Sequence, residues 1–169
     1  MPITTKLVDY ENPRDCRDLV RLLGEYASLE NGDDNPDLSG LPRQLAEFPT
    51  AFSLLGYADQ DPPIAVGLIN CFFGFSTFYG RRLVNVHDLI VTQQHRGKGV
   101  GGALLQAVEK IAREHDCCRL TLEVYANNAP ALRAYQKHGF SRDPAHPNID
   151  TLFLRKSLDE QLSDFRAQD

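Results

Sequence analysis

The sequence predicts one α/β or α+β domain built around a sheet of mixed strand direction. Three observations support this class. The chain has 169 residues, about the length of one domain. Its second half alternates between strand-like and helix-like segments, whereas its first half contains a meander of strand-like segments. No stretch has the composition of an interdomain linker, so we expect residues 1–169 to form a single domain.

The first elements of the chain are predicted to be a strand and a helix. Residues 3–10 alternate between apolar and polar side chains, which indicates a strand. Pro13 then opens a helical pattern. Its apolar face is expected to contain Cys16, Leu19, Val20, Leu23, Tyr26 and Ala27.

A loop, a short helix and a hairpin are expected next. The polar segment ENGDDNPD indicates a loop, and the short helix starts at Asp37 or Ser39 and ends near Phe48. Residues 51–59 and 64–77 are then the two strands of a hairpin.

The second half contains the clearest helix. After a strand over 81–92, apolar residues recur with helical spacing at Val100, Ala103, Leu104, Ala107, Val108, Ile111 and Ala112. Glu109 and Arg113 stand four residues apart on the other side, in the favourable order. A strand over 119–124, a helix over 129–139 closed by Gly139 and a final strand over 149–158 follow.

Composition excludes several classes of partner. The net charge of −5 argues against nucleic acid, which binds to clustered lysine and arginine. The longest apolar run, Ile64–Phe75, is broken by Asn70 and is too short to span a membrane. The first residues do not resemble a signal peptide, so we expect a soluble, cytoplasmic protein without a membrane partner.

The cysteines and histidines do not have the spacing of metal ligands. Cys117 and Cys118 are adjacent and precede a strand, where small buried hydrophobic residues are needed. His115 is the nearest histidine to them, but no C-x-x-C pair exists. We therefore expect reduced thiols and no metal.

The segment that indicates a ligand-binding site is QQHRGKGVGGALL (93–105), between a predicted strand and a predicted helix. Its four glycines allow backbone N–H groups to approach a ligand, and the helix N-terminus favours a phosphate or pyrophosphate. Arg96 and Lys98 add positive charge. The alternative is a turn whose glycines only allow close packing.

Gly97, Gly99 and Gly102 also satisfy the dinucleotide pattern G-x-G-x-x-G. A Rossmann domain normally opens with that turn and continues through further βαβ units to an acid at a strand end. Here the turn comes late in the chain, and Glu123 lies inside a strand-like segment. A nicotinamide-dependent oxidoreductase is therefore a weak alternative.

Two motifs resemble the GNAT superfamily of N-acetyltransferases. Residues 94–99 fit its coenzyme A pyrophosphate motif, [Q/R]-x-x-G-x-[G/A]. Asn128, Ala131 and Tyr135 fit N-x-x-A-x-x-x-Y, and Gly139-Phe140 closes the helix as in that family. The strand VHDLIV is similar to the one in the polyamine-acetylating branch. The resemblance extends from about residue 82 to residue 158.

The resemblance implies a mostly antiparallel sheet of six to seven strands, flanked by about four helices, with a splay that holds acetyl-CoA. Leu89, Ile90 and Val91 would pair with pantetheine through their main chain. Asn128 would bind near pantetheine, and Tyr135 would face the thioester sulfur and protonate the leaving thiolate. The coenzyme pyrophosphate would contact Gln94, Arg96, Gly97, Lys98, Gly99, Val100, Gly101 and Gly102.

A general base is also required, because an alkylamine with a pKa near 10.4 is about 99.9% protonated at pH 7. His87, Asp88 and Glu123 are the candidates. Strand alternation places His87 with Asn85 and Leu89, and Asp88 on the opposite face. The sequence does not determine which of these faces is directed into the site.

The expected function is acetyl transfer from acetyl-CoA to a small-molecule amine, or less probably to a peptide amine. Glu30, Asp33, Asp34 and Asp37 would give the first loop a negative rim that attracts a cationic amine. A CoA-binding sensor without catalysis is the alternative from another class. The resemblance is compatible with a homodimer in which the C-terminal strand pairs across a two-fold axis.

Overall fold

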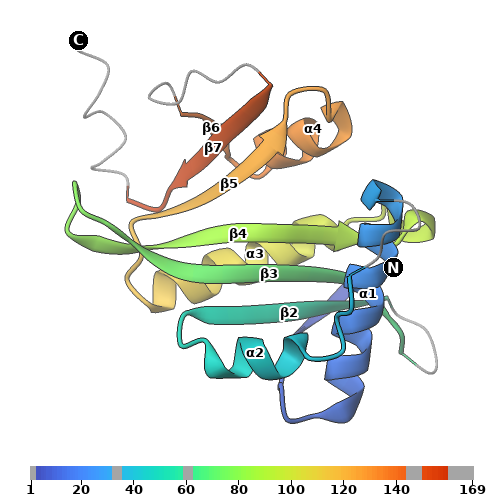
Figure 1. The fold of residues 1–169 in the computed structure, drawn as a ribbon. Coiled ribbons are helices and arrows are strands. Elements are labelled where there is room, and N and C mark those ends of the chain that lie inside the picture. The colour runs from blue at the N-terminus through green and yellow to red at the C-terminus, as the bar shows by residue number, and fades with distance from the viewer. Residues whose placement is uncertain (1–2, 32–35, 59–62, 144–149, 160–169) are drawn as a thin grey trace. The chain divides into compact units, whose positions relative to one another are not determined.

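The computed structural model describes residues 3–31, 36–58, 63–143 and 150–159. Its strands are β1 (Ile3–Leu7), β2 (Ala51–Ala58), β3 (Ala65–Ser76), β4 (Arg81–Val91), β5 (Arg119–Tyr125), β6 (Ser141–Arg142) and β7 (Thr151–Ser157). Its helices are α1 (Pro13–Asn31), α2 (Leu41–Glu47), α3 (Val100–Glu114), α4 (Ala129–Lys137) and the 3₁₀ turn η1 (Gln93–His95) (Figure 1).

The strands form one sheet in the order β1-β2-β3-β4-β5-β7-β6. The pairs β1–β2, β5–β7 and β6–β7 are antiparallel, and β4–β5 is parallel. The predicted class, a mixed and mostly antiparallel sheet of six to seven strands with about four helices, is confirmed for the described residues.

Two compact units make up the chain. The first contains Met1–Cys71 and Asp88–Ala107, and the second contains Phe72–His87 and Val108–Asp169. Each unit has its own buried apolar residues.

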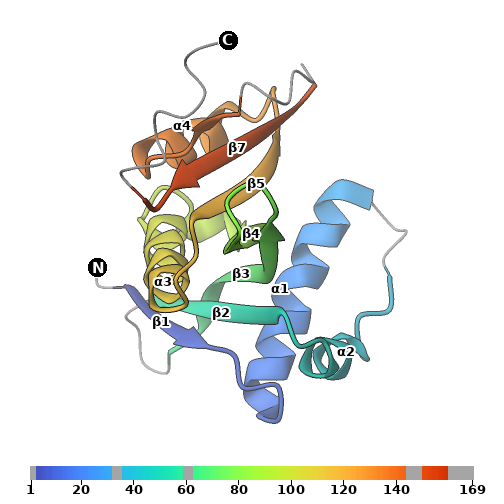
Figure 2. The ribbon, with the colours of Figure 1, turned by 90° about the vertical axis from the view of Figure 1, so that its left-hand side faces the viewer.

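In the first unit, helices pack on both faces of β2 and β3. One face carries a core of Leu19 and Leu22 from α1 with Leu55, Leu68 and Ile90 from the strands. On the other face, Gly56 and Gly67 lie against Val100 and Leu104 in the first turns of α3. Figure 2 shows α1 and α3 on these opposite sides of β2.

The face of α1 differs from the prediction. Leu19 is buried as expected, but the other fully buried positions are Leu22 and Asp15, while Tyr26 is exposed. Asp15 can be buried because Lys6 Nζ donates to both of its carboxylate oxygens at 2.7 Å and the Asp9 N–H donates at 3.0 Å. A charged residue therefore occupies a position that apolar periodicity cannot identify.

In the second unit, β5 and β7 are paired along their length (Figure 1). The core residues come from strands, from α3 and from the segments that follow α3 and α4, and include Leu120, Leu122, Leu154, Val108, Ala112, Cys117, Cys118 and Phe140. The predicted pair is present: Glu109 Oε1 accepts from Arg113 Nη2 at 2.8 Å, and Lys156 Nζ donates to Glu109 Oε2 at 2.6 Å.

Strand β6 and the resulting position of the C-terminal strand β7 in this unit were not predicted. The two-residue strand β6 pairs with Leu154 and Arg155 of β7, so the C-terminal strand lies between β5 and β6 rather than at the sheet edge.

None of the described helices is long and apolar enough to cross a membrane.

Candidate active site

The glycine turn joins the end of β4 to the start of α3 within the first unit. The Thr92 N–H donates to the Val66 carbonyl at 2.9 Å, which fixes the end of β4. The first bond of the helix runs from the Ala103 N–H to the Gly99 carbonyl at 3.0 Å. The N–H groups of Gly101 and Gly102 therefore precede the helical ladder and remain available to a ligand.

Backbone geometry explains two of the four glycines. Gly97 and Gly99 have φ values of +74° and +89°, which a side chain rarely adopts. A Cβ at either position would meet nothing within 4 Å, so the surface over these amides is open. A Cβ at Gly101 would make ordinary contacts with Val91 and Leu89, at 3.7 and 3.9 Å. An anion can approach the turn at Gly97 and Gly99.

Cationic and polar side chains surround this turn. Arg96 is exposed, and its Nε donates to the Val91 carbonyl at 3.1 Å, which holds the guanidinium beside the end of β4. Thr92 Oγ1 and His95 Nδ1 lie 3.1 Å apart in η1. Lys98 and Gln94 are also exposed. The turn thus combines unbonded amides, a helix N-terminus and two cations, the features of an anion site.

The last residues of β4 alternate as predicted within the first unit. Leu89 and Val91 are the nearest side chains to Gly101 of α3. Ile90 belongs to the core that contains α1, and Asp88 hydrogen-bonds to Asn70 of β3. Asp88 and Leu89 thus point to opposite faces of the strand.

A chain of hydrogen bonds ends at the Asp88 carboxylate. Asn70 Nδ2 donates to Asp88 Oδ2 at 3.0 Å, and Ser53 Oγ donates to Asn70 Oδ1 at 2.6 Å. The Tyr10 hydroxyl lies 2.8 Å from Ser53 Oγ. Because Ser53 has one proton and gives it to Asn70, Tyr10 is the donor in that contact. We call Tyr10, Ser53, Asn70 and Asp88 the polar chain.

The polar chain is largely shielded from water. Ser53 and Asn70 are 1% and 5% exposed, and burial raises the pKa of Tyr10 despite its bond to Ser53. Every donor in the chain points toward Asp88, so the hydrogen bonds fix the orientation of its carboxyl group. The sequence analysis missed these partners, although a polar Asn70 inside the apolar run Ile64–Phe75 is a signal that could have indicated them.

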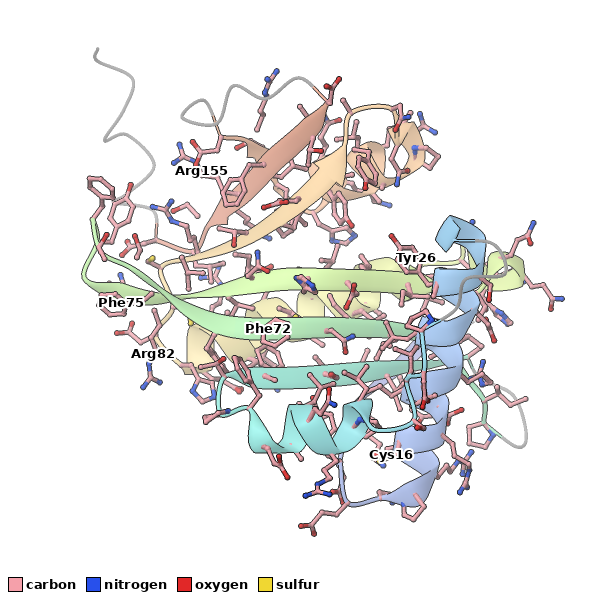
Figure 3. All side chains as sticks on the ribbon, viewed as in Figure 1. Cys16, Tyr26, Phe72, Phe75, Arg82 and Arg155 are labelled. Carbon is pink, nitrogen blue, oxygen red and sulfur yellow. The ribbon has the colours of Figure 1, made fainter. Side chains whose placement is uncertain are left out.

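The other two base candidates belong to the second unit. His87 is exposed, and its ring is nearly perpendicular to that of Phe72, with centroids 5.5 Å apart. Figure 3 labels Phe72 on β3. Glu123 is exposed on β5, opposite Phe153 of β7. Asp88 alone of the three candidates lies in the first unit.

Helix α4 carries the second predicted motif. Asn128 is its N-cap, and the side-chain Oδ1 accepts from the Ala131 N–H at 3.3 Å. The structural role of Asn128 was not predicted, although Pro130 two residues later is typical of a helix start. Its oxygen accepts this bond within the helix, and its Nδ2 forms no hydrogen bond with the described residues.

Tyr135 lies at the end of that motif. It is 9% exposed, and its ring meets the edge of the Phe140 ring with centroids 5.8 Å apart. Gly139 ends the helix with φ +83°, as predicted, and the Phe140 N–H donates to the Tyr135 carbonyl at 3.0 Å. This closing turn positions the Tyr135 backbone.

The acidic loop is described only in part. Asp37 is exposed, and hydrogen bonds from the Ser39 backbone and side chain hold its pKa below the usual range. Asp33, Asp34 and the side chain of Glu30 lie outside the described residues. Among the side chains that are described, no group of three His, Cys, Asp or Glu residues could hold a metal ion.

The model of the acetyltransferase (GNAT) family matches residues 17–140, most of the chain and both motifs. The chain belongs to this family. It is therefore a GNAT-type N-acetyltransferase, as the two motifs predicted.

Relatives of this GNAT acetyltransferase are named for different acceptors. It is 28% identical to a thialysine N-epsilon-acetyltransferase of Bos taurus over 133 residues, 74% of this chain and 78% of that protein. It is 38% identical to a streptothricin acetyltransferase of Streptomyces lavendulae over 88 residues, 50% of this chain. The chain spans about half of that second relative, 46% of its length.

Solved structures share the fold. A chain of the NatC complex bound to Gag peptide and CoA has a TM-score of 0.71 at 23% identity, with coverage of 94% of this GNAT chain and 100% of that chain. Arabidopsis thaliana NAA60 in complex with acetyl-CoA has a TM-score of 0.70 at 16% identity, with coverage of 93% and 99%. At such identities the likeness shows the fold alone.

Proposed function

We propose that this acetyltransferase transfers the acetyl group of acetyl-CoA to a primary amine of a small molecule by direct attack on the thioester. Membership of the GNAT family supports acetyl-CoA as the co-substrate. The names of the thialysine and streptothricin relatives favour a small-molecule acceptor. The observation that carries the proposal is the open glycine turn at the start of α3.

The coenzyme pyrophosphate binds to the amides of this turn. The N–H groups of Gly97 and of residues 99–102 supply the donors, whereas the Lys98 N–H donates to the His95 carbonyl at 3.4 Å. Arg96 and Lys98 supply positive charge at the rim. Gln94 lies at the same exposed turn. The main chain of residues 89–91 pairs with pantetheine, and Asn128 donates to it through Nδ2.

Asp88 accepts a proton from the incoming ammonium group. It is the candidate for which the structure gives a buried set of donors, through Asn70 and Ser53. A carboxylate whose second oxygen is held by Asn70 keeps one orientation and one free oxygen for the amine. His87 and Glu123 are exposed and remain alternatives.

Tyr135 protonates the departing thiolate. The amine nitrogen attacks the carbonyl carbon, the oxyanion collapses, and the carbon–sulfur bond breaks with its electron pair on sulfur. A thiol has a pKa near 8.5 and a phenol a pKa near 10, so the phenol can share its proton with the thiolate at small cost. The near-complete burial of Tyr135 limits competition from water.

The test is to mix the protein with acetyl-CoA and a panel of polyamines, amino acids, aminoglycosides and peptides, and to follow free thiol. Tyr135→Phe should lower turnover about 10- to 10³-fold, the range of general-acid contributions, with little change in coenzyme affinity. The matched control is Tyr125→Phe, which removes the hydroxyl of an exposed tyrosine on β5.

Three outcomes would contradict this proposal or a part of it. Calorimetric binding of acetyl-CoA without transfer to any amine would indicate a CoA-binding sensor. Equal turnover in Tyr135→Phe and the wild type would remove Tyr135 from the mechanism. Thermal stabilisation by NAD but not by CoA would instead indicate the dinucleotide alternative.

A further inference from the structure

A cavity of about 280 Å³ lies within the second unit, and its lining includes none of the residues with proposed catalytic roles. Two arginines, Arg119 and Arg155, contribute to its wall. Tyr79, Ser141, Ser157 and the backbone of Gly139 complete most of the lining. None of the described lining residues is acidic.

Strand register places both arginines on one face of the sheet. Arg119 of β5 is opposite Ser157 of β7, and Thr121 of β5 is opposite Arg155 of β7. Ser141 of β6 is opposite Arg155 on its other side. Diagonal neighbours of this kind lie about 7–8 Å apart, within reach of long side chains.

The charges around the cavity do not balance. Arg155 Nη1 lies 3.5 Å from Asp143 Oδ2, and this carboxylate is 4% exposed. Arg119 instead stacks on the Tyr79 ring, with its guanidinium carbon 4.3 Å from the ring centroid. Arg119 forms no ion pair or hydrogen bond with the part of the chain that the structure describes. Of the two guanidinium groups, only that of Arg155 is thus paired with a carboxylate among the described residues.

The geometry points to a binding site for a small oxyanion, a carboxylate or a phosphate group. The planar guanidinium of Arg119 offers a fork of N–H donors that matches two oxygens of such a group, and stacking on Tyr79 fixes its plane. Ser141 adds a hydroxyl donor. Ser157 contributes an acceptor only, since its Oγ donates to the Asp159 carbonyl at 2.8 Å.

Two sources of oxyanion have this chemistry: a free phosphate-type ligand, and an anionic group on the acetyl acceptor. Only the second source rests on the proposed function. A carboxylate on the acceptor would be recognised on the same strands, β5 and β7, that carry Glu123 and Phe153. The two sources differ in whether Arg119 affects transfer.

The first experiment titrates inorganic phosphate and malonate into the protein by calorimetry. Arg119→Gln removes the charge and the guanidinium fork, keeps a polar side chain and should weaken binding of both anions at least 10-fold. The matched control is Arg82→Gln, an exposed arginine of β4 outside the cavity, which lies well apart from Arg155 in Figure 3 and should bind as the wild type does. Arg155→Gln is less useful, because it leaves Asp143 buried without this partner.

The outcomes separate the sources. Loss of anion binding in Arg119→Gln, with unchanged KM for lysine and lysinamide, assigns the cavity to a free anion. A rise in KM for lysine but not for lysinamide assigns it to a carboxylate on the acceptor. The proposed site would be overturned if phosphate and malonate bound to Arg119→Gln as tightly as to the wild type. It would also be overturned if Arg96→Gln, and not Arg119→Gln, weakened their binding. If no amine is acetylated, the calorimetric comparison of the wild type with Arg119→Gln still tests the anion site.

Discussion

Gly67 should be essential for the packing of α3 on β3. An ideal Cβ there would lie 2.6 Å from Val100 Cγ1, 3.1 Å from Leu104 Cδ1 and 3.3 Å from the Ile90 carbonyl oxygen. The first distance is about 1 Å shorter than the optimal separation of two carbon atoms. Val100 is β-branched at the start of a helix, so it has essentially one rotamer and cannot turn aside.

Gly67→Ala should therefore lower the free energy of unfolding by about 1–3 kcal/mol, the usual cost of overpacking. For a chain of this length, each kcal/mol lowers Tm by about 2–4 °C. Because Val100 follows the glycine turn directly, a displaced α3 should also weaken acetyl-CoA binding. Urea unfolding followed by circular dichroism, with calorimetric titration of the coenzyme, measures both effects.

Gly24→Ala is the matched control. Gly24 lies inside α1, and a Cβ there would meet nothing within 4 Å. Alanine should raise the free energy of unfolding by about 0.5–1 kcal/mol, because glycine is unfavourable in a helix interior. If Gly67→Ala proved as stable as Gly24→Ala, the close packing of α3 against β3 would be refuted.

Three further changes test the turn, the polar chain and a histidine. Gly99→Val should weaken acetyl-CoA binding by more than about 2 kcal/mol, because φ +89° disfavours valine; wild-type affinity by calorimetry in a folded variant contradicts the role of the turn. Asn70→Leu should lower turnover by about 10-fold or more, because the Asp88 carboxylate loses the donor that fixes its orientation; unchanged turnover in a folded variant would contradict the role of the polar chain. Burial, then Lys156 and Lys137, lowers the pKa of His138, so the unfolded chain binds the proton more readily. The free energy of unfolding should fall as pH drops below about 6.5, and urea titrations of His138→Gln should show a flatter dependence.

The sequence predicted the elements whose signals are local. The apolar spacing of α3 identified Val100, Leu104, Val108 and Ala112, all of which are buried. The glycine turn was identified because the residues that need a positive φ, Gly97 and Gly99, are themselves glycines close together in the sequence. By contrast, β6 has only two residues and no periodicity, so no sequence pattern indicates it.

Features that depend on tertiary contacts were not predictable. The buried position of Asp15 depends on Lys6 from another element. The helical pattern alone assigns only apolar residues to the core, so it could not predict a buried aspartate. The polar chain depends on β2, β3 and β4 placing Ser53, Asn70 and Asp88 on one face. The sequence left three candidates for the base, and these contacts support the proposal of Asp88.

The buried cysteines determine how the protein behaves toward thiol reagents. Cys71, Cys117 and Cys118 are at most 3% exposed. Burial, reinforced by nearby Asp88, raises the pKa of Cys71, and burial also raises the pKa of Cys117. A protonated, enclosed thiol alkylates slowly, so at neutral pH the coenzyme thiol released by transfer should react with a maleimide well before these three cysteines do.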